Sequence, residues 1–516
     1  MSNIKTVRKA LISVYYKEGL DNIIRSLSQK GVAFFSTGGT YDFIKSLGIE
    51  CTKIEDLTGY PSILGGRVKT LHPKVFGGIL GRPGHGGDTE DMKAYGIDTF
   101  DLVVVNLYPF EATLKSGASH KDIIEKIDIG GISLIRAAAK NYAHVLCISS
   151  PEQYPALAEI AGREEISTSE EERLKFAYYS FLRSSSYDTA IAGYMGIASD
   201  EATGNNTTGE AFDVHAGNPV SLRYGENPHQ NGTFYGKLED VFIQLHGKEL
   251  SYNNLLDLEA GIALIKDFDE TTFAILKHNN ACGIASRPTL TAAWKAALEA
   301  DPVSAYGGVL ITNSPIDDEA AAEINKIFFE IILAPGYEKN ALEILQTKKN
   351  RIILQTKSFD FQDKQFRSIL NGVLVQDKDL KTETTDDIRF ITNKRPDAGQ
   401  MEDLLFANKI VKHSKSNAIV LASGKQLLAS GIGQTSRVDA LKQAIAKAQS
   451  FGLELRNAVM ASDAYFPFAD SVEIAHQAGI TSVIQPGGSI RDNDTIEYCN
   501  KHDISMVFTG IRHFKH

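Results

Sequence analysis

Short apolar runs that alternate with helical periodicity constrain the fold of this 516-residue chain more than any other feature. An apolar β-type run covers Ala10–Val14, and residues 20–27 then place apolar side chains on one helix face. The same succession recurs at three further runs, Val32–Phe35, Leu102–Val105 and Val145–Ser149. Because strands that alternate with helices tend to pair in parallel, the N-terminal part predicts a parallel α/β sheet.

The alternation resumes in the C-terminal part of the chain. Its β-type runs are Phe273–Leu276, Val309–Thr312, Ile352–Leu354, Ile419–Ala422, Val459–Ala461, Ser482–Ile484 and Met506–Phe508. Helical stretches at Leu290–Ala300 and Val438–Gln449 separate several of these runs. The pattern favours two packed α/β units, although no clean internal repeat is visible in the sequence.

A change of composition near Asp200 marks the expected domain boundary. The sequence DEATGNNTTGEAFDVHAG is rich in Gly, Asn and Thr and poor in large apolar residues, which is typical of a linker or an exposed hairpin. A chain of this length also exceeds what one hydrophobic core usually supports. We therefore expect a domain at residues 1–199, a linker at 200–215 and a second domain at 216–516, itself divided near Lys378.

Composition narrows the class of protein. The formal net charge of -10, without a run of five basic residues, disfavours nucleic acid as a partner. The four cysteines lie far apart without a CxxC pair, which predicts reduced thiols rather than disulfides or a zinc site. The first residues contain only a short apolar run, too brief for a signal peptide or a membrane span. These features together predict a cytoplasmic protein.

Two glycine-containing motifs in the N-terminal part suggest an anion site. STGGT (residues 36–40) lies between a strand and a helix, where backbone amides can face a phosphate, but a plain turn would have the same sequence. GGRVKTLHP (residues 65–73) places Arg67 and Lys69 on one side of an extended segment and adds Thr70. A solvated basic loop is the alternative for this second motif.

A third motif, IDIGGISLIRAAAKN at residues 127–141, begins with Asp128 and reaches Lys140 after an alanine-rich helix. Both residues are candidates for a functional role. Asp128 would equally serve as a helix N-cap, and Lys140 as an ordinary lysine at a helix C-terminus.

In the C-terminal part, the run Phe273–Leu276 leads into KHNNACGIA, which places Lys277 and His278 at its end. Ligands bind at strand ends in parallel α/β folds, and the two side chains can serve one site only if the strand has already ended. A neighbouring ammonium favours the neutral imidazole that a general base requires. A zinc deaminase would use His278 and Cys282, but no PCxxC follows to complete the metal site.

Other polar motifs favour binding of an anion and a flat ring. LRYGENPHQ presents Arg223 and Tyr224 before a turn, which suits a phosphate or carboxylate. GQTSR ends in Arg437, and SDAYFPFAD combines aromatic side chains with Asp463 and Asp470. Aromatic surface beside carboxylates suits a heterocycle, although an aromatic core is the commoner cause.

Taken together, nine motifs across the chain closely resemble the bifunctional AICAR transformylase/IMP cyclohydrolase family: GGRVKTLHP, NLYPF, DIGG, RAAAKN, RYGENPHQ, KHNNACG, APGYE, GQTSR and SDAYFPF. The resemblance implies a methylglyoxal-synthase-like N-terminal domain and two cytidine-deaminase-like units after it. It implies formyl transfer from 10-formyltetrahydrofolate to AICAR, giving FAICAR, then ring closure of FAICAR to IMP. It also implies a homodimer with shared formyltransferase sites and no metal.

The resemblance assigns roles residue by residue. For the cyclohydrolase it implies catalytic Lys69, Tyr108, Asp128 and Lys140. The residues it implies for nucleotide binding there are Ser13, Lys17, Ser36, Thr37, Gly38, Gly39, Thr40, Arg67, Thr70, Asn106 and Gly130. The family commonly has SVSDK where this chain has Ser13, Val14, Tyr15, Tyr16 and Lys17, so a Ser-Asp pair is replaced by two tyrosines.

For formyl transfer the resemblance implies His278 as the catalytic base, beside Lys277. The residues it implies for substrate binding are Arg223, Tyr224, Gly307, Glu330, Asn417 and Arg512, and those for the folate are Arg437, Tyr465, Asp470 and Ser489. Glu330 replaces an Asp of some relatives and reaches one methylene further. A rival hypothesis makes the N-terminal domain a regulatory anion-binding module, because methylglyoxal-synthase-like domains of other proteins bind effectors without catalysis.

Overall fold

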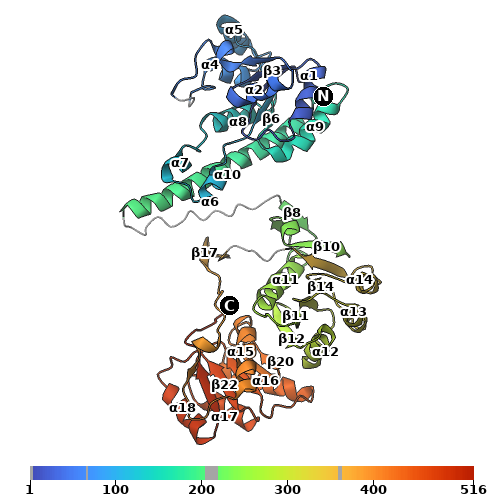
Figure 1. Cartoon of the computed structure of the whole chain (residues 1–516), viewed down its shortest axis with the longest axis vertical. Helices are drawn as coiled ribbons and strands as arrows, with labels where there is room; N and C mark the ends of the chain where they lie inside the picture. The colour runs from blue at the N-terminus through green and yellow to red at the C-terminus, as the bar shows by residue number, and fades with distance from the viewer. Residues whose placement is uncertain (1–3, 65–67, 204–218, 358–362) are drawn as a thin grey trace. The chain divides into compact units, whose positions relative to one another are not determined.

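A computed structural model describes residues 4–64, 68–203, 219–357 and 363–516. The chain divides into two compact units, Met1–His215 and Ala216–His516, and each has its own hydrophobic core (Figure 1). Within the described ranges, no helix is both long and apolar enough to cross a membrane.

The first unit is built on a five-stranded sheet in the order β4-β3-β2-β5-β6, with every neighbouring pair parallel. Its strands are β2 (Lys9–Ser13), β3 (Ala33–Ser36), β4 (Cys51–Lys53), β5 (Leu102–Val105) and β6 (Leu146–Ile148). The parallel α/β sheet predicted from the alternating pattern is confirmed. Strand β4 is the one member that the apolar runs did not indicate.

Successive residues of each strand point to opposite faces, so helices cover both sides of this sheet. Ile12 and Val104 belong to the cluster that packs on α1 and α9, whereas Leu11 and Val103 pack on α4 and α8. The helices are α1 (Asp21–Gln29), α2 (Gly38–Ser46), α3 (Ile54–Thr58), α4 (Pro73–Leu80), α5 (Gly86–Tyr95), α6 (Phe110–Lys115), α7 (His120–Ile124), α8 (Gly130–Lys140), α9 (Tyr154–Gly162) and α10 (Glu170–Thr203).

Two further features complete this unit. The short strands β1 (Lys5–Thr6) and β7 (Ser167–Thr168) pair antiparallel. Helix α10 continues to Thr203, past the expected domain end at residue 199. The remainder of the expected linker, residues 204–215, lies outside the described residues.

The second unit contains a twelve-stranded mixed sheet in which the same series of elements occurs twice. The first series is α11 (Tyr252–Ile265), β11 (Thr272–Lys277), β12 (Asn280–Ser286), α12 (Leu290–Ala300), β13 (Val309–Thr312), α13 (Asp318–Ile324), β14 (Ile331–Ala334), α14 (Lys339–Leu345) and β15 (Ile352–Thr356). The second is α15 (Ala398–Lys412), β19 (Ile419–Ser423), β20 (Gln426–Gly431), α16 (Arg437–Ser450), β21 (Val459–Ser462), α17 (Asp470–Gln477), β22 (Ser482–Gln485), α18 (Asp492–Lys501) and β23 (Ser505–Phe508). An internal repeat is therefore present that the sequence did not reveal.

Each repeat opens with an antiparallel hairpin and continues with parallel strands, in the orders β12-β11-β13-β14-β15 and β20-β19-β21-β22-β23. The expectation that Lys277 ends a strand of a parallel sheet is thus wrong, because β11 runs antiparallel to both of its neighbours. Strands added at the ends are β10 (Phe242–His246) and β18 (Arg389–Phe390), and separate hairpins are formed by β8 (Pro219–Leu222) with β9 (Gly232–Tyr235) and by β16 (Lys364–Ile369) with β17 (Gly372–Asp377).

The two repeats join through the antiparallel pair β12 and β20. Each of these strands carries a glycine against its own helix. A Cβ on Gly283 would overlap the carbonyl oxygen of Ala297, and one on Gly431 would overlap that of Ala440. Because β12 and β20 run in opposite directions, the β11–β12 turn lies at the same sheet edge as the carboxyl ends of β21, β22 and β23.

Candidate active sites

In the first unit, predicted site residues gather at the carboxyl edge of the parallel sheet. Ser13 ends β2, Ser36 ends β3 and Asn106 directly follows β5. The Ser36 hydroxyl donates to the carbonyl of Ile12 (2.6 Å), and Thr40 Oγ1 both accepts from and donates to the backbone of Val14. Both hydroxyls are buried, so they fix the loops around the site.

The exposed start of α2 is the part of this edge that is suited to an anion. Its first residues are Gly38 and Gly39, which follow the N-cap Thr37. A Cβ built on Gly38 would lie 3.5 Å from the Lys69 ammonium nitrogen, and one on Gly39 would lie 4.0 Å from that of Lys17. Two ammonium groups and the free amides of a helix N-terminus can together bind a phosphate.

Asn106 holds the first loop through its backbone. Its side-chain oxygen accepts the N–H groups of Tyr15 (2.5 Å) and Tyr16 (3.0 Å), and its amide nitrogen donates to the Tyr16 carbonyl and to the hydroxyl of Tyr154. These contacts with the loop do not depend on which side chains stand at positions 15 and 16. The two tyrosines therefore replace the family's Ser-Asp pair without removing this anchor.

A carboxylate and a phenol meet at the start of α8. Asp128 Oδ1 accepts the N–H of Gly131 (2.7 Å), as a helix cap does. Burial raises the pKa of Asp128, while hydrogen bonds from the backbone of Gly131 and Tyr108 oppose the rise. Burial also raises the pKa of the Tyr108 phenol, with a smaller contribution from the Asp128 charge. A Cβ on Gly130 would lie 3.1 Å from Thr70 Oγ1, so the Lys69–Thr70 segment links the starts of α2 and α8.

The structure does not bring Lys140 to this group. Lys140 ends α8, and the chain then enters β6 at Leu146, so the lysine lies at the amino edge of the sheet. The ten residue steps from Gly130 to Lys140 correspond to about 15 Å of helix. Arg67 lies outside the described residues.

In the second unit, Lys277 and His278 lie where β11 turns into β12. His278 and Asn279 form a two-residue turn between the paired residues Lys277 and Asn280. The Lys277 ammonium donates to the carbonyl of Tyr306 (2.8 Å), and a Cβ on Gly307 would lie 3.3 Å from it. His278 is exposed. Strand β11 ends at Lys277, so the side chain of His278 no longer follows the alternation of a strand. This meets the condition under which both side chains can serve one site.

The start of α11 surrounds this turn with polar groups. Glu330 Oε2 accepts from Asn254 Nδ2 (3.0 Å), and Glu330 Oε1 lies 3.6 Å from the ammonium of Lys248. The loop that contains Arg223 and Tyr224 joins the same helix, because the Glu226 carbonyl accepts a hydrogen bond from Asn253. The Arg223 guanidinium lies over the Tyr224 ring, 5.5 Å from its centroid.

The second repeat contributes a buried arginine to the same sheet edge. Arg437 Nη1 donates to Asn417 Oδ1 (3.1 Å) and lies 3.1 Å from a carboxylate oxygen of Asp463, while Nε donates to the Tyr465 carbonyl. Burial lowers the pKa of Arg437, and the charge of Asp463 opposes this. The backbone N–H of Lys415 donates to Asn280 Oδ1 (3.1 Å), which ties this group to the His278 turn.

Tyr465, Asp470, Ser489 and Arg512 follow the carboxyl ends of β21, β22 and β23. These strands are parallel, so the four residues share one edge, as expected for ligand-binding loops. The position of Arg512 is fixed through the next residue, His513, whose backbone N–H donates to the Asp463 carbonyl (3.0 Å).

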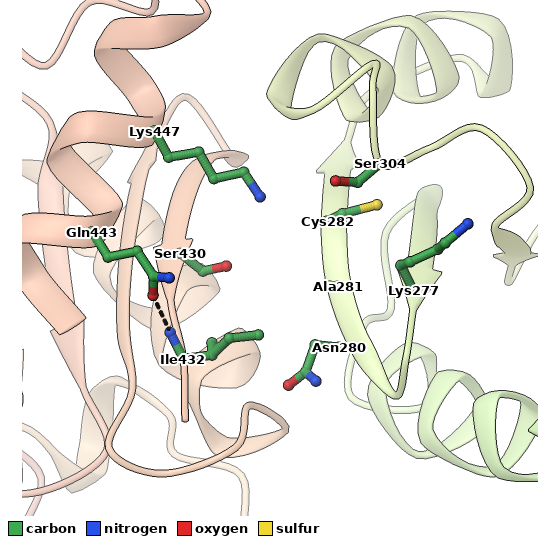
Figure 2. A pocket seen from close by; sticks show the side chains of 9 residues that line it. All are labelled: Lys277, Asn280, Ala281, Cys282, Ser304, Ser430, Ile432, Gln443 and Lys447. Atoms are coloured by element: carbon green, nitrogen blue, oxygen red, sulfur yellow. Dashed lines mark hydrogen bonds between the residues drawn. The ribbon is translucent and has the colours of Figure 1, made fainter. Parts of the chain in front are cut away.

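A pocket of about 210 Å³ lies between the two repeats. Figure 2 shows the second repeat's Ser430, Gln443 and Lys447 facing the first repeat's Lys277, Asn280 and Cys282 across it. The Lys447 ammonium lies 2.6 Å from a carboxylate oxygen of Asp301. The pocket therefore extends the space beside Lys277 with polar and cationic side chains.

The zinc-deaminase alternative finds no support in the residues that the structure describes, where no group of three or more His, Cys, Asp or Glu is arranged to hold a metal ion. Cys282 is buried, and burial raises the pKa of its thiol to about 12. Its thiol donates to the carbonyl of Ile275.

Sequence inspection missed three residues that support these sites: Tyr154, Tyr187 and Asp257. Tyr154 bonds Asn106, Tyr187 accepts the Asp128 N–H (2.8 Å), and Asp257 Oδ1 accepts the Asn279 N–H (2.6 Å). Each lies far from its partner in sequence and in no recognisable motif, so only the fold identifies it.

Comparison with known proteins was made against families, curated sequences and solved structures. A family model described as AICARFT/IMPCHase bienzyme matches residues 138–447, and one described as MGS-like domain matches residues 19–133. The bifunctional purine biosynthesis protein PurH of Bacteroides thetaiotaomicron is 61% identical over 516 residues, which cover 100% of both chains. The protein of the same name from Aquifex aeolicus is 45% identical over 98% of this chain and 100% of the relative.

Among solved structures, the crystal structure of ForH is 34% identical and has a TM-score of 0.30, covering 36% of this chain and 95% of that one. The family model covers more than half of the present chain, and the two curated relatives match almost its whole length. This chain belongs to the AICARFT/IMPCHase bienzyme family.

Proposed function

We propose that this chain transfers a formyl group from 10-formyltetrahydrofolate to AICAR and then closes the ring of the product, FAICAR, to give IMP. The observation that carries the proposal is the full-length match to bifunctional purine biosynthesis relatives, together with two separate polar sheet edges, one in each unit. Residues 1–199 are assigned the ring closure and residues 216–516 the formyl transfer. The transfer chemistry requires no metal, because the formyl donor is already activated.

For formyl transfer, the neutral imidazole of His278 accepts a proton from the amine of AICAR as its nitrogen bonds to the formyl carbon. The Lys277 ammonium keeps donors free beyond its bond to the Tyr306 carbonyl, and one of them stabilises the oxyanion of the tetrahedral intermediate. The carbon–nitrogen bond to the folate then breaks, and the folate nitrogen takes up the proton. Orientation of the two substrates supplies much of the acceleration.

Binding in the second unit is divided between the repeats. Arg223, Tyr224, Gly307 and Glu330 of the first repeat's edge, with Asn417 and Arg512 of the second, are assigned to the nucleotide. Arg437, Tyr465, Asp470 and Ser489 are assigned to the folate. The hydrogen bond between Lys415 and Asn280 supports this division, because it places both groups along one edge.

For ring closure, the carboxamide nitrogen of FAICAR bonds to the formyl carbon and water leaves. Lys17 and the start of α2 hold the phosphate, and Lys69 lies beside them to stabilise the oxyanion. Asp128 and Tyr108 move the protons. The direction of both shifts supports this role, because burial raises the pKa of the Asp128 carboxyl group and of the partly exposed Tyr108 phenol.

Two further properties belong to the proposal. The chain works in the cytoplasm, which the four unpaired cysteines support. It acts as a homodimer in which both chains complete the formyltransferase sites, as the family resemblance implies.

The direct test is incubation of the purified chain with AICAR and 10-formyltetrahydrofolate, followed by detection of IMP. His278→Ala is expected to lower formyl transfer by at least about 100-fold, because it removes the base, and to leave closure of supplied FAICAR unchanged. Comparable loss of both activities would contradict the assignment of one activity to each unit. Formation of FAICAR without IMP would instead favour a regulatory role for the first unit.

A further inference from the structure

The turn that presents His278 has a backbone conformation that histidine rarely adopts. His278 and Asn279 have φ values of 51° and 65°, in the left-handed region. Two consecutive residues of this kind form the tight turn that joins antiparallel strands, and glycine or asparagine is usual there. A histidine at the first position is held in place by the surrounding structure.

Two side chains fix this turn from its two sides. Asp257, on α11, accepts the N–H of Asn279 at its Oδ1 atom (2.6 Å). Asn280 donates from Nδ2 to the carbonyl of His278 (2.8 Å). Together they engage the N–H and the carbonyl of one peptide group, the amide that joins His278 to Asn279 at the centre of the turn.

The second repeat contains the same device without the histidine. Asp403 is the sixth residue of α15, as Asp257 is the sixth of α11, counting from Ala398 and Tyr252. Asp403 accepts the N–H groups of Gly424 (2.7 Å) and Lys425 (2.6 Å), in the turn between β19 and β20. Those two residues are also left-handed, with φ values of 58° and 52°.

The repeats differ in what the turn presents. Gly424 adopts the left-handed conformation without steric cost, and its turn lies at the sheet edge opposite to the His278 turn. In the first repeat the same position holds the imidazole. At this first position of the turn, a residue with a side chain is therefore present only in the repeat whose turn lies at the formyl-transfer edge.

The pKa of Asp257 also depends on residues of the proposed formyl-transfer site. Burial raises the pKa of Asp257, the hydrogen bond from the Asn279 N–H lowers it, and smaller effects come from His278 when it is protonated, from Glu330 and from Lys277. The carboxylate thus interacts with three residues already assigned to the substrates.

We propose that Asp257 is a positioning residue for formyl transfer: its bond to the Asn279 N–H holds the left-handed turn, and so fixes the His278 imidazole where it accepts the amine proton. The inference rests on the proposed function of His278. Asp257 does not contact the substrates; it acts through the turn.

The experiment compares Asp257→Ala with Asp403→Ala in the full-length chain, because the two variants remove the same kind of bond from equivalent turns. Asp257→Ala is expected to lower the kcat of formyl transfer by about 100-fold and to change the KM for AICAR little, since the imidazole is displaced and the binding groups are kept. Asp403→Ala is expected to lower Tm to a similar extent and to leave kcat within about twofold. Closure of supplied FAICAR reports that unit 1 is intact in both.

Two more variants separate the possible outcomes. Asp257→Asn keeps an oxygen that accepts the Asn279 N–H, so it is expected to recover kcat to within about fivefold of the unmodified chain. In a His278→Ala background, Asp257→Ala is expected to cause no further loss, because the residues act as a unit. Equal kcat values for Asp257→Ala and Asp403→Ala would overturn the proposal. If His278→Ala retains full transfer activity, the proposed function of His278 fails instead.

Discussion

Lys69 and Lys140 carry the same charge and were equal candidates in the sequence, but they lie at opposite edges of the first unit's sheet. Lys69 stands beside Gly38 at the start of α2, whereas Lys140 is exposed at the end of α8. Motif recognition found both lysines. Motif recognition could not show at which edge of the sheet each lysine lies, because the edge depends on whether the lysine precedes or follows a strand.

This difference gives a prediction for ring closure. Lys69→Ala is expected to lower the rate of FAICAR cyclisation by about 100-fold, through loss of the cation beside the phosphate and the oxyanion. Lys140→Ala is expected to stay within about threefold, since its ammonium is a helix length away. Single-turnover assays of both variants would test this, and a larger loss for Lys140→Ala would reverse the assignment.

The hydroxyl-bearing residues show what a motif leaves undetermined. STGGT correctly indicated a turn between a strand and a helix, but Ser36 and Thr40 use their hydroxyl groups to bond the backbone of Ile12 and Val14. Those partners are more than twenty positions away in the chain. Only the pairing of β2 with β3 brings them together.

At the scale of elements, long apolar runs were recognisable and short or small-residue strands were not. Val309–Thr312 and Leu290–Ala300 have the boundaries expected from the sequence. Strand β12, with the sequence NACGIAS, contains small residues that are equally typical of a loop. Its glycine lies against the Ala297 carbonyl of α12, and the sequence of the strand alone does not indicate this contact.

The C-terminal tail is held by one buried histidine. His513 is 2% exposed and bonds Asp379 (2.6 Å) through Nδ1 and Glu383 (2.8 Å) through Nε2. Burial lowers its pKa, but the two carboxylates outweigh burial and raise the pKa to about 9. The charged imidazolium of His513 is therefore the form that binds the C-terminal tail, which includes Arg512, to Asp379 and Glu383.

This raised pKa predicts how stability depends on pH. The folded-state pKa lies above the ordinary value of 6.5, so the stabilisation is complete below about 6.5 and is lost as the pH rises through about 9. Tm measured between pH 6 and 10 should fall more for the unmodified chain than for His513→Gln, which carries no charge to lose. If Tm changes with pH in the same way in both proteins, the bonds of His513 to Asp379 and Glu383 do not contribute to stability.

At the scale of the whole molecule, the alternating pattern predicted an α/β protein correctly but did not indicate the antiparallel hairpin that opens each repeat of the second unit. Alternation does not distinguish a hairpin followed by helices from a purely parallel series, because both give short apolar runs. The internal repeat was equally hidden. Its equivalent positions, such as His278 and Gly424, share backbone conformation and not side-chain chemistry.

The division into two compact units predicts separable activities. A fragment of residues 1–203, which includes all of α10, is expected to close the FAICAR ring within about threefold of the full chain's rate, because a unit with its own core can fold alone. It should show no formyl transfer. An inactive but folded fragment, judged by circular dichroism, would favour the regulatory module.

The two repeats also determine how many histidine turns each chain contains. A chain that contains the same unit twice resembles a covalently joined pair of subunits, and such a pair would ordinarily offer two equal sites. Here the symmetry mate of the histidine turn presents Gly424 and Lys425 at the far edge of the sheet. The scaffold is therefore present twice and the imidazole at this turn position once, so each chain has one histidine turn for two repeats.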